Sequence, residues 1–414
     1  MNIQAEIQVP GDKSLSHRAF LLGALARGTT TIRGSLESKD VMNTIGALQS
    51  LGADIVRKDQ EWVICGGNLR EPAAVIDAGN SGTTARILSG ILSGINGVSV
   101  ISGDSSLNTR PMDRIIEPLT RMGAHLMARR GSYLPMAIQG GNLHSIDYVM
   151  PIASAQVKSC LLLAGLFADG TTCVHEPVKS RDHTERMLKF FNARINIEGL
   201  RVNLKGPQKL NARDVHIPAD PSTAAFPVVW AATTPGSELL IKNVCLNPTR
   251  TGYINVLKRM GASIIIKNTA TQNNEPVGDV LVKGAALKAT TIRSDEIPAL
   301  IDEIPVLGIA AALAHGRTVI RDARELRVKE TDRIKAMAQG FSALDSKIEE
   351  LEDGFVIEGP LSLNSGRVKT FADHRIAMAF HILSLATDID VTLDMPGCVD
   401  ISYPGFFESM EALK

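Results

Sequence analysis

The sequence predicts an α/β protein of two domains, each made of three copies of one supersecondary unit. Three observations support this prediction. The chain has 414 residues, which at the usual domain size corresponds to about two or three domains. A pattern of helix, turn and short strand recurs six times, at spacings of 66 to 80 residues. Hydrophobic residues make up 44% of the chain and aromatic residues only 4%, so a large core is possible and must be mainly aliphatic.

Each repeat is expected to begin with a short strand, a polar turn and a helix. The turns are rich in Asp, Ser and Gly, of which Asp and Ser are strong helix caps. They stand at 10–14, 78–82, 151–155, 218–222, 301–303 and 371–375. We therefore expect a helix to start at each of these six places.

The first helix of each repeat is expected to end at a turn that leads into a β-branched strand. These turns contain Gly28, Gly97, Gly170, Gly236, Gly316 and Asp388. A second helix then ends at a Gly or Asn, and an alternating strand follows. The helix ends are Gly52, Gly123, Asn192 and Gly261. Each repeat thus reads strand, turn, helix, strand, helix, strand.

The first repeat begins with a strand, and the last repeat lacks one. The last repeat stops at Lys414 without its final strand, whereas the first begins with a strand at 3–9. We infer that this N-terminal strand pairs within the C-terminal half, which makes one domain discontinuous. The expected domains are 1–13 plus 227–414, with repeats four to six, and 14–226, with repeats one to three. Six recurrences in phase argue against chance similarity among ordinary βα units.

Charge, hydropathy and cysteine usage exclude several classes of protein. Lys and Arg number 44, as do Asp and Glu, so the chain lacks the excess basic charge typical of a nucleic-acid binder. The longest apolar runs are too short to span a membrane, and no signal peptide is evident, so we expect a cytoplasmic protein. The 5 cysteines form no C-x-x-C pair, which predicts buried free thiols, and no histidine spacing indicates a metal site.

The polar turns are also candidate anion sites. Unpaired N–H groups and the dipole at a helix start favour phosphate and carboxylate. Ser14 and Arg18 share one face of the first helix, beside Lys13. A capping serine between two solvated cations explains this turn equally well. Gly82, in a glycine-rich turn, would let a ligand approach the backbone, although a plain structural turn is as good an interpretation.

Further cations and acids occur at the other turns. Arg110 precedes a helix with Pro111 in its first turn. The run 324–333 is the densest in charge, which usually indicates a solvated helix face and alternatively an anion site with its own general acid. Asp302 and Glu303 lie between apolar residues, where burial is costly unless they are paired or functional.

These turns, in this order, resemble the 5-enolpyruvylshikimate-3-phosphate synthase family. The matching stretches cover nearly the whole chain and are 10–18, 79–83, 109–112, 154–156, 327–333 and 373–375. The resemblance implies two domains of three βαβαββ units each, an inside-out α/β barrel, with ligands in an interdomain cleft that closes on them. It implies transfer of the enolpyruvyl group of phosphoenolpyruvate to the 5-hydroxyl of shikimate 3-phosphate, with release of phosphate, by addition and elimination. It implies no metal and no organic cofactor. We expect a monomer that binds neither nucleic acid nor membranes.

The resemblance also implies a role for each site residue. Those expected to hold phosphoenolpyruvate are Lys13, Gly82, Arg110, Arg333 and Arg375, of which Lys13 also assists proton transfer. Those expected to hold shikimate 3-phosphate are Ser14, Arg18, Ser154, Ala155, Gln156 and either Ser180 or Arg181, with Gln156 touching both substrates.

Three further residues are implied in the chemistry itself. Asp302 would accept the proton of the 5-hydroxyl, Lys329 would orient that hydroxyl, and Glu330 would act as the acid at the methylene. Addition and elimination use such carboxylates in opposite senses, so the assignment of Asp302 and Glu330 stays open. A lysine that some family members carry near the C-terminus is replaced here by Ile401, and glyphosate is expected to compete with phosphoenolpyruvate.

Two other functions remain as alternatives. A related transferase acts on UDP-N-acetylglucosamine and needs a reactive loop cysteine, but Cys65 lies in an expected strand and Cys160 on an apolar helix face. A non-enzymatic repeat scaffold that binds anions would not need Asp302 and Glu330 among its cations.

Overall fold

A computed structural model describes residues 3–387 and 389–414, so the turn position Asp388 lies outside the described residues. The chain divides into two compact units. Unit 1 contains the chain up to Pro10, Pro218–Thr271 and Pro276–Lys414, and unit 2 contains Gly11–Ile217 and Gln272–Glu275. These divisions precede the helices that start at Lys13 and Pro221, so each helix stays whole. A division at 226 would have cut the second of them.

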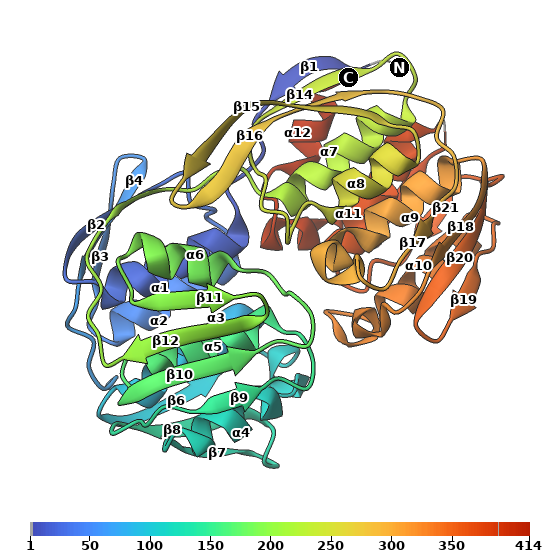
Figure 1. Ribbon diagram of the computed structural model, residues 1–414. Helices are drawn as coiled ribbons and strands as arrows, with labels where there is room; N and C mark the ends of the chain where they lie inside the picture. The colour runs from blue at the N-terminus through green and yellow to red at the C-terminus, as the bar shows by residue number, and fades with distance from the viewer. Residues whose placement is uncertain (1–2, 388) are drawn as a thin grey trace. The chain divides into compact units, whose positions relative to one another are not determined.

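Unit 2 contains repeats one to three. Its helices are α1 (Lys13–Leu25), α2 (Lys39–Ser50), α3 (Gly82–Gly94), α4 (Asp113–Arg121), α5 (Ala155–Gly165) and α6 (His183–Phe190), with the 3-10 helix η1 (Leu107–Thr109). Its strands are β2 (Gly28–Arg33), β3 (Asp54–Lys58), β4 (Glu61–Gly66), β5 (Ile76–Asp77), β6 (Gly97–Ser102), β7 (His125–Arg129), β8 (Tyr133–Gly140), β9 (Asp147–Val149), β10 (Gly170–His175), β11 (Ile195–Glu198), β12 (Arg201–Gly206) and β13 (Asp214–His216). Helix α5 packs against β10 and β12, as Figure 1 shows.

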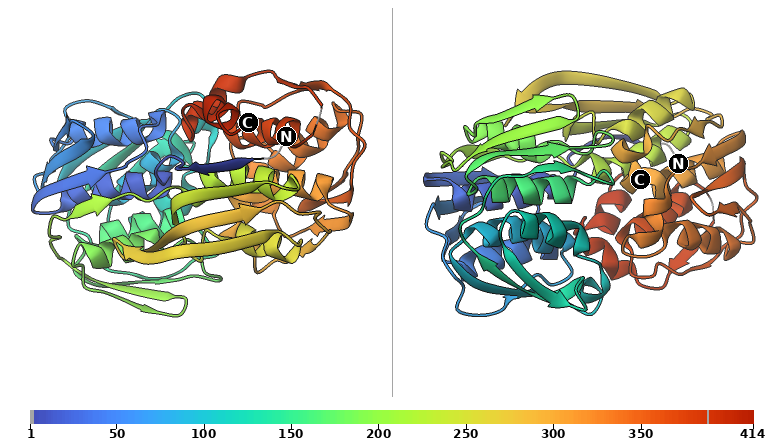
Figure 2. Two further views of the ribbon diagram at one scale, coloured as in Figure 1. Left: turned by 90° about the horizontal axis from the view of Figure 1, so that it is seen from above. Right: turned by 60° about the horizontal axis from the view of Figure 1, so that its bottom comes forward.

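Unit 1 contains repeats four to six. Its helices are α7 (Pro221–Thr233), α8 (Gly252–Arg259), α9 (Ile304–Leu313), α10 (Arg333–Ser342), α11 (His374–Ala386) and α12 (Phe406–Glu411), with the 3-10 helices η2 (Ile297–Ala299), η3 (Ile301–Glu303), η4 (Arg324–Val328) and η5 (Pro396–Ile401). Its strands are β1 (Gln4–Ile7), β14 (Glu238–Cys245), β15 (Ser263–Gln272), β16 (Glu275–Lys283), β17 (Thr291–Ile292), β18 (Gly316–Ile320), β19 (Glu349–Leu351), β20 (Gly354–Gly359), β21 (Gly366–Val368) and β22 (Val391–Leu393). The long strands β15 and β16 are seen in yellow in Figure 2.

The described residues form five four-stranded sheets and one two-stranded sheet. Their orders are β13-β2-β4-β3, β5-β6-β8-β7, β9-β10-β12-β11, β1-β14-β16-β15, β17-β18-β20-β19 and β21-β22. The predicted α/β class is confirmed. In the described part of the chain no sheet closes on itself, because each sheet ends in edge strands.

The pairing within the four-stranded sheets adds a strand to the repeat derived from the residues. The second helix is followed by an antiparallel hairpin, for example β3 with β4, rather than by one strand. The alternating pattern predicted a single strand there, because it did not reveal the turn that divides the hairpin into two strands.

Repeats one and four exchange their leading strands. The N-terminal strand β1 pairs in parallel with β14 of repeat four. In return, β13, which precedes the first helix of repeat four, pairs in parallel with β2 of repeat one. Each exchanged strand thus completes a four-stranded sheet in the unit to which it belongs.

The first helix of every repeat is largely buried. In unit 1, α7, α9 and α11 pack on one another and form much of the aliphatic core. In unit 2, α3 packs closely on α5. These helices are apolar nearly all round, which is typical of helices enclosed by sheets.

Local signals place the ends of these helices as predicted. Side-chain caps at α1, α3, α5, α7 and α11 come from Asp12, Ser81, Ser154, Asp220 and Asp373. The turns after the helices use glycine at positive φ, for example 104° at Gly28 and 128° at Gly97. In the described part of the chain, no helix combines the length and the apolarity needed to cross a membrane.

Candidate active site

In unit 2, the start of helix α3 lies beside two guanidinium groups. A Cβ at Gly82 would lie 2.8 Å from Nη1 of Arg86 and 3.7 Å from Nη1 of Arg110. Two guanidinium groups therefore lie at the start of α3, an arrangement suited to phosphate. Arg86 was not among the predicted site residues, although it follows Gly82 by one helical turn.

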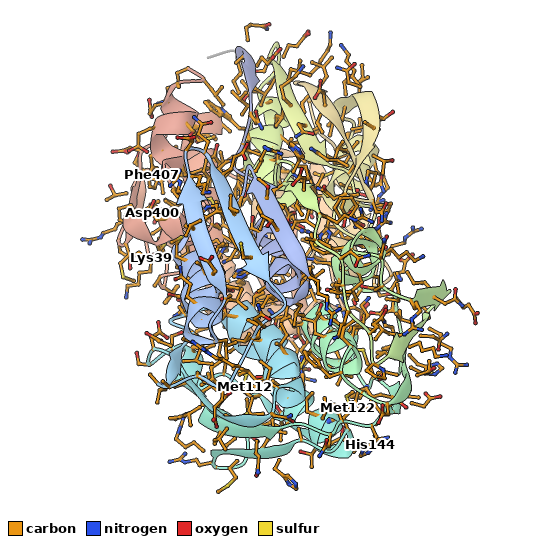
Figure 3. The ribbon with its side chains drawn as sticks, turned by 90° about the vertical axis from the view of Figure 1, so that its left-hand side faces the viewer. Lys39, Met112, Met122, His144, Asp400 and Phe407 are labelled. Atoms are coloured by element: carbon orange, nitrogen blue, oxygen red, sulfur yellow. The ribbon has the colours of Figure 1, made fainter. Side chains whose placement is uncertain are left out.

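The segment around Arg110 is fixed on both sides. Its Nη2 donates to Oδ1 of Asn80 at 2.6 Å and to Oγ of Ser106 at 3.1 Å. Met112, labelled in Figure 3, is fully buried, and its N–H donates to the Ser132 carbonyl at 2.7 Å. Helix α4 begins after Met112, so Pro111 precedes the helix instead of occupying its first turn.

Gln156 joins the starts of helices α3 and α5. Its Oε1 accepts from Nη1 of Arg86 at 3.0 Å, and its Nε2 donates to Oγ1 of Thr83 at 3.1 Å. Ser154 caps α5 by accepting from the Val157 N–H, and Ala155 is the first helical residue. The structure thus brings Gly82, Arg110 and Gln156 into one neighbourhood.

Helix α1 positions Lys13 and Arg18. Nζ of Lys13 forms an ion pair with Asp40. Arg18 is 5% exposed, and its Nε donates to Oγ1 of Thr184 at 2.6 Å while Nη2 donates to Oγ of Ser159 at 2.8 Å. Nη1 of Arg18 donates to the Ser14 carbonyl at 3.0 Å, which ties the guanidinium to the start of the helix.

Ser180 and Arg181 lie between strand β10 and helix α6. The N–H of Ser180 donates to Oε1 of Glu176 at 3.1 Å, and its hydroxyl donates to the same oxygen. Ser180 therefore offers its hydroxyl proton to a phosphate only by leaving Glu176. Arg181 is half-buried next to it.

In unit 1, the predicted residues form one ionic cluster around Arg333. This side chain is 1% exposed. Its Nε lies 2.8 Å from Oδ2 of Asp373, its Nη1 3.3 Å from Oδ1 of Asp302, and its Nη2 2.6 Å from Oε2 of Glu330. A solvated helix face is therefore wrong for Arg333, although Arg324 of the same run is 77% exposed.

Two further predicted cations of unit 1, Lys329 and Arg375, lie near Asp302. Nζ of Lys329 lies 3.8 Å from its Oδ1, and Nη2 of Arg375 lies 3.9 Å from its Oδ2. Nη1 of Arg375 donates to the Asp302 carbonyl at 3.1 Å and lies 3.6 Å from Oε1 of Glu303. Glu303 is buried, and the free-energy cost of burying its carboxylate is offset in part by Arg375.

The charge state of Glu330 follows from these neighbours. Burial disfavours its carboxylate, but Arg333, His374 and Lys329 outweigh that effect and hold the pKa of Glu330 well below its usual range. The side chain is 32% exposed, so solvent also stabilises the carboxylate. Without substrates, Glu330 is therefore ionised at neutral pH.

Comparison with known proteins identifies the family. The model described as "EPSP synthase (3-phosphoshikimate 1-carboxyvinyltransferase)" matches residues 1–410. The chain belongs to the EPSP synthase family. A 3-phosphoshikimate 1-carboxyvinyltransferase of Carboxydothermus hydrogenoformans is 49% identical over 99% of this chain and 97% of its own. One of Geobacillus kaustophilus is 47% identical over 100% and 98%.

Solved structures agree with this membership. EPSP synthase from Acinetobacter baumannii is 42% identical, with a TM-score of 0.90 over 100% of this chain and 96% of its own. The enolpyruvyl transferase NikO from Streptomyces tendae is 16% identical, with a TM-score of 0.77 over 100% and 95%, and so shares the fold. The resemblance inferred from the turns is confirmed.

Neither Cys65 nor Cys160 fits the reactive loop cysteine expected of the alternative transferase. Cys160 is fully buried in α5, and burial raises the pKa of its thiol far above the usual range. Cys65 is exposed, against the expectation of a buried thiol, because its position on β4 points outward. It lies in a regular strand paired on both sides and not in a loop.

Several residues that hold the site were not predicted. Asp40, Ser159 and Thr184 contact Lys13 or Arg18 from distant parts of the chain, and no sequence signal connects them. Asp373 had a signal, since it stands in the sixth polar turn. Ile401 ends the 3-10 helix η5 and carries no charge.

Proposed function

We propose that the protein transfers the enolpyruvyl group of phosphoenolpyruvate to the 5-hydroxyl of shikimate 3-phosphate, with release of phosphate. Membership of the EPSP synthase family supports this 3-phosphoshikimate 1-carboxyvinyltransferase activity in the shikimate pathway. The observation that carries the proposal is the pair of cation-rich clusters, one in each unit, on the residues that match the family motifs. Both substrates are polyanions, and such ligands require fixed cations.

Phosphoenolpyruvate is bound by Lys13, Gly82 and Arg110 of unit 2 and by Arg333 and Arg375 of unit 1. The guanidinium groups beside Gly82 support this role, because bidentate arginines suit phosphate and carboxylate groups. Arg86 joins this set in our proposal. Glyphosate competes with phosphoenolpyruvate for these residues.

Shikimate 3-phosphate is bound by residues at the starts of α1, α5 and α6. These are Ser14, Arg18, Ser154, Ala155, Gln156 and either Ser180 or Arg181. Because the hydroxyl of Ser180 donates to Glu176, phosphate binding by Ser180 would require that this bond be broken. Gln156 touches both substrates, which its link to Arg86 and Thr83 supports.

The carboxylates of unit 1 carry the proton transfers. Asp302 accepts the proton of the 5-hydroxyl. Lys329, whose Nζ lies 3.8 Å from Oδ1 of Asp302, orients that hydroxyl. Glu330 is ionised without substrates and stabilises positive charge that develops on the enolpyruvyl group. It becomes the acid at the methylene once the anionic substrates offset Arg333 and Lys329. We further propose that the protein acts as a monomer in the cytoplasm.

Phosphate release tests this function. The protein is mixed with phosphoenolpyruvate and either shikimate 3-phosphate or UDP-N-acetylglucosamine. We expect phosphate only when phosphoenolpyruvate and shikimate 3-phosphate are both present. Release with UDP-N-acetylglucosamine alone as acceptor would replace the proposal by the related transferase. No release with either acceptor would favour the binding scaffold.

A further inference from the structure

Unit 2 contains a buried ionic cluster that the proposed mechanism does not use. The side chains of Lys158, Glu176 and Glu185 are all 0% exposed. Nζ of Lys158 lies 2.8 Å from Oε2 of Glu176 and 2.7 Å from Oε1 of Glu185. Burying three charges is costly, and well-packed apolar residues are often as stable. Stability alone therefore does not explain these residues.

A fourth charge completes the cluster at the surface. Nζ of Lys179 lies 4.0 Å from Oε1 of Glu185, and its side chain is 32% exposed. The cations Lys158 and Lys179 thus balance the two carboxylates. Because Glu176 and Lys179 both belong to the segment that precedes α6, the cluster fixes this segment at two points.

The same segment carries the candidate ligands of the shikimate 3-phosphate phosphate group. Oε2 of Glu176 faces Lys158, whereas its Oε1 accepts from the N–H and the hydroxyl of Ser180. One carboxylate therefore links the buried lysine to the residue directly before Arg181. A charged acceptor makes these hydrogen bonds stronger than a neutral one would.

The neighbours of the cluster hold the other candidate phosphate ligand. Ser159, next to Lys158 on α5, and Thr184, next to Glu185 on α6, both accept from Arg18. The oxygens of Ser159 and Thr184 are 2.6 Å apart. The ionic cluster thus lies one residue away from the contacts of Arg18 on both helices.

We propose that Lys158 is a positioning residue for shikimate 3-phosphate. Through Glu176 it fixes the segment that bears Ser180 and Arg181, and through Glu185 it fixes the start of α6 beside Arg18. It does not touch the substrate. This inference deepens the proposed function and rests on it.

The test compares Lys158→Met with the double variant Lys158→Met/Glu176→Gln. The single variant leaves two buried carboxylates with one remaining cation, so it is expected to lose stability. The double variant keeps the net charge of the cluster and is expected to fold. For the double variant we expect the KM for shikimate 3-phosphate to rise about tenfold, the loss typical of a charge-assisted hydrogen bond. The KM for phosphoenolpyruvate should change less than about twofold, within ordinary scatter of mutational effects.

Two controls separate positioning from other causes. Cys160→Ala changes the same helix on the side of Gly90, and both KM values should stay as in the wild type. Hydrogen exchange of the Ser180 amide should become faster in the double variant, because its acceptor is weakened.

The outcomes are distinct. A folded double variant with an unchanged KM for shikimate 3-phosphate would overturn the positioning role. An equal rise in both KM values would show a general structural role and would also overturn it. A wild type without turnover would instead refute the proposed function.

Discussion

The three guanidinium nitrogens of Arg333 contact the carboxylates of Asp302, Glu330 and Asp373. At the scale of single residues, this geometry aligns three carboxylates through one side chain. A lysine has one compact charge and cannot reproduce a planar fork. The carboxylates would then lose alignment with one another as well as with the substrate.

Arg333→Lys is therefore expected to lower kcat/KM for phosphoenolpyruvate about a hundredfold, as for loss of an aligned electrostatic group. Steady-state kinetics with fixed shikimate 3-phosphate measures this change. The variant Arg324→Lys, on the exposed part of the same run, is the matched control and should behave as the wild type. Equal activity of Arg333→Lys and the wild type would contradict the role given to the guanidinium.

Gly82→Ala tests the other cluster at the same scale. The added methyl would meet Nη1 of Arg86 at 2.8 Å, and Arg86 is held by Gln156. Displacing Arg86 removes one charged hydrogen bond, so the KM for phosphoenolpyruvate should rise about tenfold. Gly46→Ala, where a Cβ meets nothing within 4 Å, is the control. An unchanged KM would show that Arg86 is not needed for phosphoenolpyruvate.

At the scale of elements, helices α11 and α12 contain a pH-sensitive contact. The ring of His381 lies 4.8 Å from that of Phe407 and 5.5 Å from that of Phe406. Burial lowers the pKa of His381 to about 4, with a further decrease from Lys414 and an opposing effect of Glu411. An unfolded histidine has a pKa of about 6.5. Between these values the unfolded chain binds a proton that the folded chain does not.

Stability should therefore fall as the pH decreases from about 6.5 to about 4. In His381→Leu this loss should be smaller, which thermal melts at pH values across the range would show. Part of the loss remains, because burial also lowers the pKa of His17. A variant whose melting temperature fell with pH as steeply as that of the wild type would contradict this assignment.

The turn before α11 contains two residues with a left-handed backbone. Phe371 and Ala372 have φ of 54° and 56°, and the Asp373 N–H donates to the Thr370 carbonyl at 3.0 Å. Left-handed backbone costs a residue with a side chain about 1 kcal/mol. Two hydrogen bonds from Thr370 to Asp394 hold the turn on its other side.

Ala372→Gly should relieve this strain and raise the free energy of unfolding by about 1 kcal/mol. Urea unfolding of the variant and the wild type measures the difference. A lower stability of the variant would mean that the greater conformational entropy of glycine in the unfolded chain outweighs the relief of strain.

At the scale of the whole molecule, the sequence predicted the repeated pattern well and the long-range partners poorly. Caps such as Asp12 and turns such as Gly28 act through neighbouring residues, so their signals are local. The exchange of β1 and β13 depends on pairing between residues far apart in the chain. Only one half of that exchange was inferred, from the missing final strand.

The same difference applies to the candidate site. Lys13, Arg110 and Arg333 were predicted as site residues from short stretches of neighbouring residues, so their signals are local. Asp40 contacts Lys13 and Thr184 contacts Arg18 through the fold, and nothing near Asp40 or Thr184 in the chain indicates these contacts. The charge of Glu330 was also beyond the sequence, since it depends on Arg333, His374 and Lys329 together.

The central claim is that one reaction draws on residues of both units. The most direct measurement is kcat/KM for phosphate release with phosphoenolpyruvate and shikimate 3-phosphate, for the wild type, Lys13→Ala of unit 2 and Asp302→Asn of unit 1. The account predicts that each variant folds and that its kcat/KM falls about a thousandfold, which is the range for loss of a charged ligand or a general base. Retention of activity within about tenfold of the wild type by either folded variant would contradict it.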